Sequence, residues 1–276
     1  MEGKIEMTTT CICGSSQITD NNDIQDNLIE ELDKRMNWNH SINVGDAKGI
    51  DYFTQLYLNS QNWKKVCVWY TDSTPRNIVE NPYWKRLKVV GGYTKRDREM
   101  LNNSDELIAV WNNKSPGTKR NIDSFTKGKV TVMCEGINIS SDEAGLGGAL
   151  SINDKAAYRK NKIKRTYSLE WDGVEYDGAI DIWNNDKIKN KYLNYEIEHN
   201  IYEPLPLFLR DIMKAKFISN KYLHDEIRNK GGIDFLRRCK HIKNNRPSKV
   251  RDMWEGEGYE SLYIDCLIDA YLELLD

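Results

Sequence analysis

Residues 11–16 read C-I-C-G-S-S, and this short stretch decides the fold class. Its strand-forming side chains stop at Gly14, and an apolar stripe with helical spacing, Ile24, Leu28 and Leu32, begins a few residues later. A strand, a glycine corner and an amphipathic helix in this order are typical of the first βα unit of a parallel sheet. Because the first N–H groups of a helix have no partner within the helix, such a corner also suits an anionic ligand.

The same alternation of strand and helix continues to residue 134. The expected strands are 10–13, 41–44, 65–70, 87–90, 106–111 and 130–134. The expected helices between them are 22–36, 51–58, 95–102 and 119–126. Short connections between alternating strands and helices predict an α/β domain with a Rossmann-like parallel sheet over residues 1–140.

The second half of the chain has a different pattern. Residues 141–165 are small, polar and rich in glycine, which predicts a linker, and a further ligand loop at its glycines is the alternative. Over residues 166–276 we predict a mainly helical α+β domain, in which two D-G pairs indicate a hairpin. The expected helices of this domain are 207–218, 224–228, 235–239 and 261–275.

Composition narrows the class of protein. The 276 residues include 40 basic and 42 acidic side chains, a net charge of −2, and this balance disfavours a nucleic-acid binder. The basic run at 236–251 is the one feature that keeps a DNA-processing role as an alternative, and a solvated helix face explains it as well. No apolar stretch approaches the roughly 18 residues that a membrane span needs. The first residues lack the apolar segment of a secretory signal, so we expect a cytoplasmic protein.

The cysteines point to buried thiols. There are six cysteines and four histidines, and their spacing matches no zinc site, so no metal or cofactor is expected. Cys11 and Cys13 would lie on one face of the first strand, where cysteine acts as a small apolar side chain. Six free thiols suit a reducing compartment.

Four strand-to-helix corners share one chemistry: each holds glycine together with hydroxyl or cationic side chains. The carboxyl ends of parallel strands meet at one edge of a sheet, so these corners would together form a cradle for phosphate. The sequence contains no G-x-x-x-x-G-K-[ST], which excludes a P-loop NTPase, and no G-x-G-x-x-G follows the first strand. The candidate ligand-binding residues are Gly14, Ser15, Ser16, Gly45, Asp46, Lys48, Gly49, Lys95, Ser115, Pro116, Gly117, Thr118 and Asn121.

Together the corners C-G-S-S, G-D-A-K-G-I-D, Y-T-K-R-D-R-E-M and K-S-P-G-T-K-R-N-I resemble those of the SLOG superfamily, over residues 8–136. That superfamily includes Lonely-Guy-type cytokinin phosphoribohydrolases, the DNA-processing protein A family and YspA/YpsA-like proteins, and the YspA-like branch is the most similar. The resemblance implies a Rossmann-like fold that binds nucleotides or nucleotide-derived ligands such as ADP-ribose. It also leads us to expect a homodimer.

The resemblance also implies roles for individual residues. Arg96 would take the part of the arginine of the phosphoribohydrolases, and residues 115–118 would form their phosphate loop. Asn121 stands where those enzymes carry a catalytic glutamate, and an amide can serve neither as general acid nor as general base. Either the site only binds, or a carboxylate comes from elsewhere. The candidate catalytic residues are Arg96, Asp51, Asp97 and Glu99.

Plainer interpretations of these residues stay open. Asp46 and Asp51 could simply cap the helix that begins near residue 50. Arg96 and Asp97 could form an exposed ion pair, and such pairs stabilise a fold very little.

The second half contains K-A-K-F-I-S-N-K-Y-L-H-D-E-I at 214–227 and M-W-E-G-E-G-Y-E-S-L at 253–262, and these two segments resemble the C-terminal half of NADAR proteins. Members of that family remove ADP-ribose from N-glycosidic linkages. The resemblance implies that Trp254 stacks on a base or a nicotinamide-like ring, and a core aromatic is the alternative. The catalytic helix of the family is not recognisable, and Y-E-I-E-H at 195–199 is the only candidate remnant.

The two halves lead to one hypothesis. We expect an enzyme that binds a nucleotide or an ADP-ribose or NAD derivative and hydrolyses its N-glycosidic bond. Such a protein would belong to nucleotide metabolism or to conflict between bacteria and viruses. Because of Asn121, a non-catalytic sensor or sink for the same ligand is the first alternative, and a DNA-processing accessory protein is the second.

Overall fold

The computed structural model describes residues 8–19, 22–198, 205–242 and 253–275. The chain forms two compact units, Met1–Glu135 and Gly136–Asp276, and each is described by itself. None of the helices in these described ranges is both long and apolar enough to cross a membrane.

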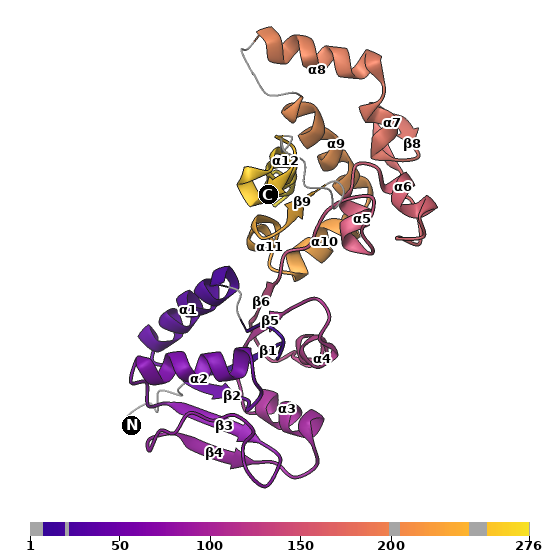
Figure 1. The fold of residues 1–276 in the computed structure, drawn as a ribbon. Coiled ribbons are helices and arrows are strands. Elements are labelled where there is room, and N and C mark those ends of the chain that lie inside the picture. The colour runs from indigo at the N-terminus through magenta and orange to yellow at the C-terminus, as the bar shows by residue number, and fades with distance from the viewer. Residues whose placement is uncertain (1–7, 20–21, 199–204, 243–252, 276) are drawn as a thin grey trace, which may run out of the picture. The chain divides into compact units, whose positions relative to one another are not determined.

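The first unit contains a six-stranded sheet in the order β4-β3-β2-β1-β5-β6, with all neighbouring strands parallel (Figure 1). Its strands are β1 (Thr9–Gly14), β2 (Ser41–Val44), β3 (Val66–Tyr70), β4 (Lys85–Lys88), β5 (Glu106–Trp111) and β6 (Val130–Cys134). The strand order reverses between β1 and β5, so the corners after these two strands lie at the point where parallel α/β sheets bind ligands. The predicted Rossmann-like α/β fold is confirmed.

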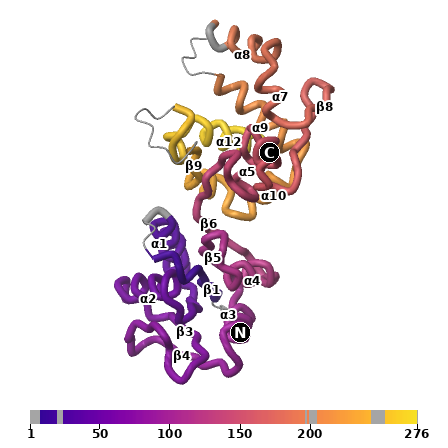
Figure 2. Tube along the Cα trace, turned by 45° about the vertical axis from the view of Figure 1, so that its right-hand side comes forward, coloured from indigo at the N-terminus to yellow at the C-terminus, as the bar shows by residue number. Residues whose placement is uncertain are grey.

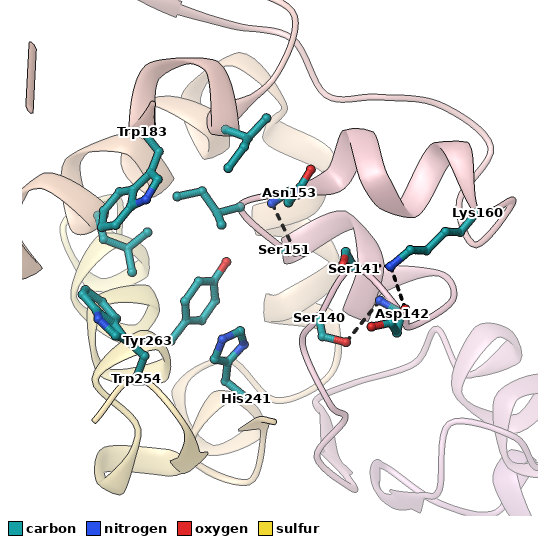
Figure 3. A pocket seen from close by; sticks show the side chains of 13 residues that line it. Ser140, Ser141, Asp142, Ser151, Asn153, Lys160, Trp183, His241, Trp254 and Tyr263 are labelled. Carbon is teal, nitrogen blue, oxygen red and sulfur yellow. Dashed lines mark hydrogen bonds and ion pairs between the residues drawn. The ribbon is translucent and has the colours of Figure 1, made fainter. Parts of the chain in front are cut away.

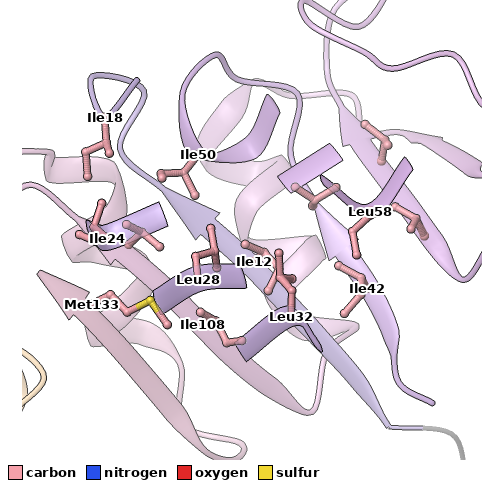
Figure 4. Packing of buried hydrophobic residues seen from close by; sticks show 14 of the residues in the cluster. Ile12, Ile18, Ile24, Leu28, Leu32, Ile42, Ile50, Leu58, Ile108 and Met133 are labelled. Atoms are coloured by element: carbon pink, nitrogen blue, oxygen red, sulfur yellow. The ribbon is translucent and has the colours of Figure 1, made fainter. Parts of the chain in front are cut away.

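Four helices cover the two faces of this sheet (Figure 2): α1 (Asn22–Asn37) and α2 (Ile50–Ser60) on one, α3 (Tyr93–Asn102) and α4 (Pro116–Ser124) on the other. The side chains of β1 alternate between the faces because successive residues of a strand point in opposite directions. Ile12 packs under α1 and α2, with Leu28 and Ile108 among its neighbours (Figure 4). Cys11 and Cys13 share the opposite face, as their spacing predicts.

One predicted strand is displaced. β4 spans Lys85–Lys88 instead of 87–90, and it pairs with β3 through Trp69 and Leu87. All four of its residues are exposed, since it is an edge strand. An exposed edge strand has no buried face to impose an alternating pattern, which is why the sequence located it poorly.

The second unit is mainly helical, as predicted. Its helices are α5 (Leu146–Leu150), α6 (Asp154–Arg159), α7 (Ala179–Trp183), α8 (Asp186–Glu198), α9 (Pro206–Ser219), α10 (Lys221–Asn229), α11 (Ile233–Arg237), the 3-10 helix η1 (Gly258–Glu260) and α12 (Leu262–Leu272). The pairs β7 (Leu169–Trp171) with β8 (Val174–Tyr176), and β9 (Lys240–His241) with β10 (Gly256–Glu257), are antiparallel. Asp172 and Gly173 join β7 to β8 with φ of 49° and 76°, a turn in which both central residues are left-handed, as in the favoured hairpin type.

The segment 141–165 differs from the predicted linker. It forms α5 and α6 and contributes buried side chains, among them Leu150 and Ala157, to the second unit. A Cβ added at Gly147 or Gly148 would overlap a neighbouring backbone oxygen. These glycines therefore allow close packing of the chain on itself, which explains a glycine-rich composition without a linker or a ligand loop.

Candidate functional sites

The corners after β1, β2 and β5 meet at the carboxyl edge of the sheet. The backbone N–H of Ile50, at the start of α2, donates to the carbonyl oxygen of Ser15 across 3.5 Å. The amide of Asn112, just after β5, donates to the side-chain oxygen of Gln17 across 2.9 Å. The structure thus brings together three of the four corners that the sequence singled out, and Arg96 of the fourth reaches Asp46 of the second.

Three glycines of these corners are explained by contacts within the protein. A Cβ at Gly14 would lie 2.5 Å from the side chain of Ile50, and one at Gly49, which has φ of 74°, would lie 2.7 Å from the carbonyl oxygen of Ser15. A Cβ at Gly45 would overlap a carboxylate oxygen of Asp51. The corners need glycine so that protein elements can approach one another, whatever else they bind.

Arg96 is held by two carboxylates. Its Nη1 donates to Oδ1 of Asp46 across 2.5 Å, and its Nε and Nη2 donate to Oδ1 of Asp97 across 2.9 and 2.6 Å. The guanidinium is buried, so its pairing with Asp97 is not the exposed ion pair that the sequence left open. An anionic ligand at Arg96 would have to displace or adjoin these carboxylates.

Asp46 is saturated by a second arginine that the sequence did not indicate. The backbone N–H of Arg76 donates to Oδ2 of Asp46 across 3.0 Å, and its Nη2 donates to Oδ1 across 2.8 Å. Burial alone would raise the pKa of Asp46, but the hydrogen bonds from Arg76 and the charge of Arg96 outweigh it and hold this pKa below its usual value. The Arg76 guanidinium also lies 3.9 Å from the centre of the Tyr93 ring.

Asp51 is the unusual carboxyl group of this edge. Burial raises its pKa to about 7, the charges of Asp97 and Asp46 act in the same direction, and Arg96 opposes them. The backbone N–H of Ala47 donates to Oδ2 of Asp51 across 3.3 Å. A carboxyl group that titrates near neutral pH is a common feature of functional sites, although structural networks also produce it. Since Gly49 occupies the N-cap of α2 and no side chain caps it, Asp46 and Asp51 do not cap the helix.

The remaining candidates of the first unit lie outside the cluster of Asp46, Asp51 and Arg96. Ser115 caps α4, with its Oγ accepting from the Thr118 N–H across 3.4 Å and from the Thr118 hydroxyl across 3.1 Å. Asn121 is buried, and its side chain is hydrogen-bonded to the sulfur of Cys13. Among the other candidates, Lys48, Lys95 and Pro116 are exposed, and Ser16, Gly117 and Glu99 are half-buried. Across the described part of the chain, no three His, Cys, Asp or Glu side chains are arranged to hold a metal ion.

The second unit contains a pocket of about 440 Å³, and Trp254 lines it (Figure 3). Trp254 meets Trp183 edge to face, with 5.9 Å between the ring centres, and Trp183 stacks on Phe208 at 5.4 Å. The stack on Phe208 fixes the position of Trp183. This end of the pocket is therefore a preformed aromatic corner.

The other end of the pocket is polar. Lys160 pairs with Asp142, with 2.7 Å between Nζ and Oδ1, and Ser140 and Ser151 line the wall nearby. The Oγ atoms of these serines accept backbone N–H groups across 3.2 Å each, from Asp142 and Asn153. Among the described residues neither hydroxyl donates a hydrogen bond, so both protons are available to a ligand.

Two stacked rings form the wall between these ends. His241 lies on Tyr263 with 4.2 Å between ring centres and an interplanar angle of 12°. The Tyr263 hydroxyl donates to the carbonyl oxygen of Leu150 across 2.9 Å, and burial raises its pKa well above the usual value. Nδ1 of His241 lies 2.5 Å from the carbonyl oxygen of Ile139, so both rings are fixed by the backbone.

A buried ion pair supports the pocket from behind. Lys216 and Asp154 are both 0% exposed, with 3.5 Å between Nζ and Oδ1. Nζ of Lys216 also donates to the carbonyl oxygen of Ser151 across 2.9 Å, and the N–H of Tyr167 donates to Oδ2 of Asp154 across 2.7 Å. Burial lowers the pKa of Lys216 to about 8 and raises the pKa of Asp154. The pair thus fixes residues 151–154, three of which line the pocket.

Of the residues around this pocket, sequence reasoning had found Trp254 alone. Several others belong to the segment interpreted as a linker, and Trp183 and Tyr263 carry no signal that separates them from core aromatics. Glu198, from the candidate remnant at 195–199, is exposed on α8, while residue 199 lies outside the described residues. Most of the basic run at 236–251, from residue 243 onward, lies outside them as well.

Comparison of the chain with family models, with curated protein sequences and with solved structures gave no match in any of the three. The SLOG and NADAR resemblances therefore stay predictions, and a function has to be argued from the chemistry of the sites.

Proposed function

We propose that the chain binds a nucleotide or an ADP-ribose or NAD derivative in the pocket of the second unit, and that it hydrolyses the N-glycosidic bond of this ligand. One observation carries the proposal. A single pocket runs from an aromatic corner at Trp183 and Trp254 to a hydroxyl- and lysine-lined end at Ser140 and Lys160 (Figure 3).

The aromatic corner suits the base. Stacking of a nucleobase on an aromatic side chain contributes about 1–3 kcal/mol to binding, and any base or a nicotinamide ring offers the flat face this needs. Trp183 is held against Phe208, so little side-chain entropy would be lost when a ring enters.

The polar end suits the sugar and phosphates. The hydroxyl protons of Ser140 and Ser151 can donate to ribose or phosphate oxygens, and Lys160 supplies a cation. Pockets for small molecules commonly range from about 300 to 1,000 Å³, so 440 Å³ accommodates a ligand of nucleotide size.

Among the described residues that line this pocket, Asp142 is the one with a carboxylate. As the bond between C1′ and the base nitrogen breaks, positive charge develops on the ribose, and a carboxylate nearby stabilises it. Water then adds to C1′ and loses one proton. With a neutral base such as adenine this proton goes to the base nitrogen, and with NAD, whose ring nitrogen is cationic, nicotinamide leaves as a neutral molecule and the proton goes to solvent. The products are the free base and the ribosyl compound. We assign Asp142 to this stabilising role.

Binding without cleavage is the second candidate function. Asp142 is about half exposed, at 53% of its side-chain surface, and it is paired with Lys160. Water and the Lys160 charge screen such a carboxylate, so it stabilises a developing positive charge less than a buried one does. This favours a sensor or sink for the same ligand. The SLOG resemblance further predicts a homodimer, which light scattering after size-exclusion chromatography checks.

The test uses the full chain with ADP-ribose, NAD and AMP, followed by calorimetry for binding and by chromatography for free base. Trp254→Ala should weaken binding about ten-fold or more, because a stacking surface is lost. Trp38→Ala, which removes a 57% exposed tryptophan of the first unit, is the matched control and should leave binding unchanged. Asp142→Asn should keep binding and lose release of base.

The outcomes separate the two functions. Binding by the wild type without any release of base would exclude the hydrolase and leave the sensor. If Trp254→Ala and wild type bind all three ligands equally, or if none of them binds, the assignment of the pocket is wrong.

A further inference from the structure

The first unit holds a cavity of its own, about 280 Å³ between α3 and α4, which the proposed function does not use. Its lining includes three cations: Arg98 on α3, Arg120 on α4 and Lys127 just after α4. Leu101 and Phe125, which are buried, supply its apolar part. We call this cavity the α3–α4 groove.

The groove has an excess of positive charge. No Asp or Glu lines it, and within the described residues no ion pair joins Arg98 or Arg120 to a carboxylate. The carboxylates nearby are engaged by other cations, since Asp97 binds Arg96 and Asp123 binds Lys119.

Lys127 is likewise not neutralised. Its Nζ donates to the carbonyl oxygen of Asn102, the last residue of α3, across 2.5 Å. This contact places the ammonium at the C-terminal end of the helix, which favours a cation, but it does not cancel a full charge.

A phosphoryl group would satisfy this arrangement. Guanidinium groups bind phosphate oxygens through paired, charge-assisted hydrogen bonds, and two arginines with a lysine can share a group of charge near −2. The apolar surface of Leu101 and Phe125 would contact the carbon skeleton that carries the phosphate. The volume limits the occupant to a small molecule or to a single residue of a larger one.

We propose that the α3–α4 groove is a second ligand site, which binds a phosphorylated small molecule of the sugar phosphate class through Arg98, Arg120 and Lys127. The proposal does not rest on the function assigned to the second unit, because different residues in a different unit carry it.

The test is calorimetric titration of the full chain with ribose 5-phosphate, with ribose as the uncharged partner. Arg98→Gln/Arg120→Gln should weaken binding of ribose 5-phosphate at least ten-fold. Lys119→Gln/Lys129→Gln removes two exposed cations from the same unit that do not line the groove, and it should bind like the wild type. Both arginines are exposed, so the double variant should fold, and its circular dichroism spectrum checks this.

Three results would overturn the proposal. The wild type could fail to bind ribose 5-phosphate at millimolar concentration, both double variants could lose the same affinity for ribose 5-phosphate, or ribose could bind as tightly as ribose 5-phosphate. A fourth is binding of a single-stranded oligonucleotide in its place, with a steep salt dependence, which would assign the cations to nucleic acid. Trp254→Ala separates this site from the pocket of the second unit. Binding of ribose 5-phosphate that this variant abolishes belongs to the pocket and contradicts the groove assignment.

Discussion

Lys216→Met removes the ammonium group of a fully buried cation and keeps a side chain of similar length. In the wild type this group donates to the carbonyl oxygen of Ser151 across 2.9 Å and lies 3.5 Å from a carboxylate oxygen of Asp154. The variant leaves the buried Asp154 carboxylate without its cation, held only by backbone N–H groups such as that of Tyr167. We therefore expect a large loss of stability in the second unit.

The magnitude follows from the two lost interactions. Breaking a buried ion pair by removing one partner costs about 3–5 kcal/mol, and the unsatisfied carbonyl of Ser151 adds about 1 kcal/mol. Replacing both partners, as in Asp154→Asn/Lys216→Met, leaves no buried charge, and the asparagine oxygen can still accept from Tyr167. The free energy of unfolding of the double variant should therefore lie within about 2 kcal/mol of the wild-type value. This loss is much smaller than the sum of the losses in the two single variants.

The effect of Lys216→Met should also depend on pH. The folded protein lowers the pKa of Lys216 to about 8, against 10.5 in an unfolded chain. Between these values the unfolded state binds more protons, so this group makes the wild type more stable as pH rises. The variant lacks this gain, and its deficit should grow from pH 8 to pH 10.

Hydrogen exchange of backbone amides in α6 and α9 under increasing urea measures this stability within the second unit. Lys214→Met is the matched control on the same helix, because Lys214 is partly exposed and pairs with Glu273 at the surface, where a pair contributes at most about 1 kcal/mol. Two results would refute the reasoning. One is a loss of less than about 1 kcal/mol in the free energy of unfolding of Lys216→Met. The other is a loss in the double variant that equals the sum of the losses in the two single variants.

Two further predictions concern the edge of the sheet. Burial raises the pKa of Asp51 from 3.8 to about 7, so between these values the folded wild type binds more protons than the unfolded chain and loses stability as pH rises. Asp51→Asn lacks this loss, so its stability relative to the wild type should increase from pH 4 to pH 7 by up to about 4 kcal/mol. Urea unfolding at several pH values checks this, and parallel curves for both proteins would contradict it. Gly45→Ala should cost about 2–3 kcal/mol, because its Cβ would overlap Asp51 and lie 3.0 Å from Arg96. Gly117→Ala is its control, since the nearest atom to a Cβ there is 3.8 Å away, and equal losses in both would show that packing does not explain Gly45.

Periodicity predicted the first unit well because its strands are buried. Residues 41–44, 106–111 and 130–134 were expected as strands and are strands with those bounds. A buried parallel strand reads as a short apolar run between polar corners, and the helices between such strands show one apolar stripe each. The pattern failed at the exposed edge, where β4 has no buried face.

The second unit was harder because its short helices carry weak signals. α5 reads L-G-G-A-L, and two glycines in five residues oppose helix formation by propensity. It forms because Leu146 and Leu150 are buried against the rest of the unit, a contact that no local pattern reveals. The pocket was missed for the same reason, since its lining residues lie between Ser140 and Tyr263 in the sequence and only the tertiary fold brings them together.

In the candidate site of the first unit, two arginines of one motif lie in surroundings of different charge. Arg96 and Arg98 stand two positions apart in T-K-R-D-R-E-M, so on a helix they point about 200° apart. Arg96 turns to the edge of the sheet, where three carboxyl groups, Asp46, Asp51 and Asp97, face two guanidinium groups, its own and that of Arg76. Arg98 lines the α3–α4 groove, where none of the described lining residues carries a carboxylate. If the motif binds phosphate, the balance of charge therefore assigns that binding to Arg98. Arg98→Gln should lose phosphate binding. Adding Asp51→Asn to this variant, which removes a carboxylate near Arg96, should not restore the binding.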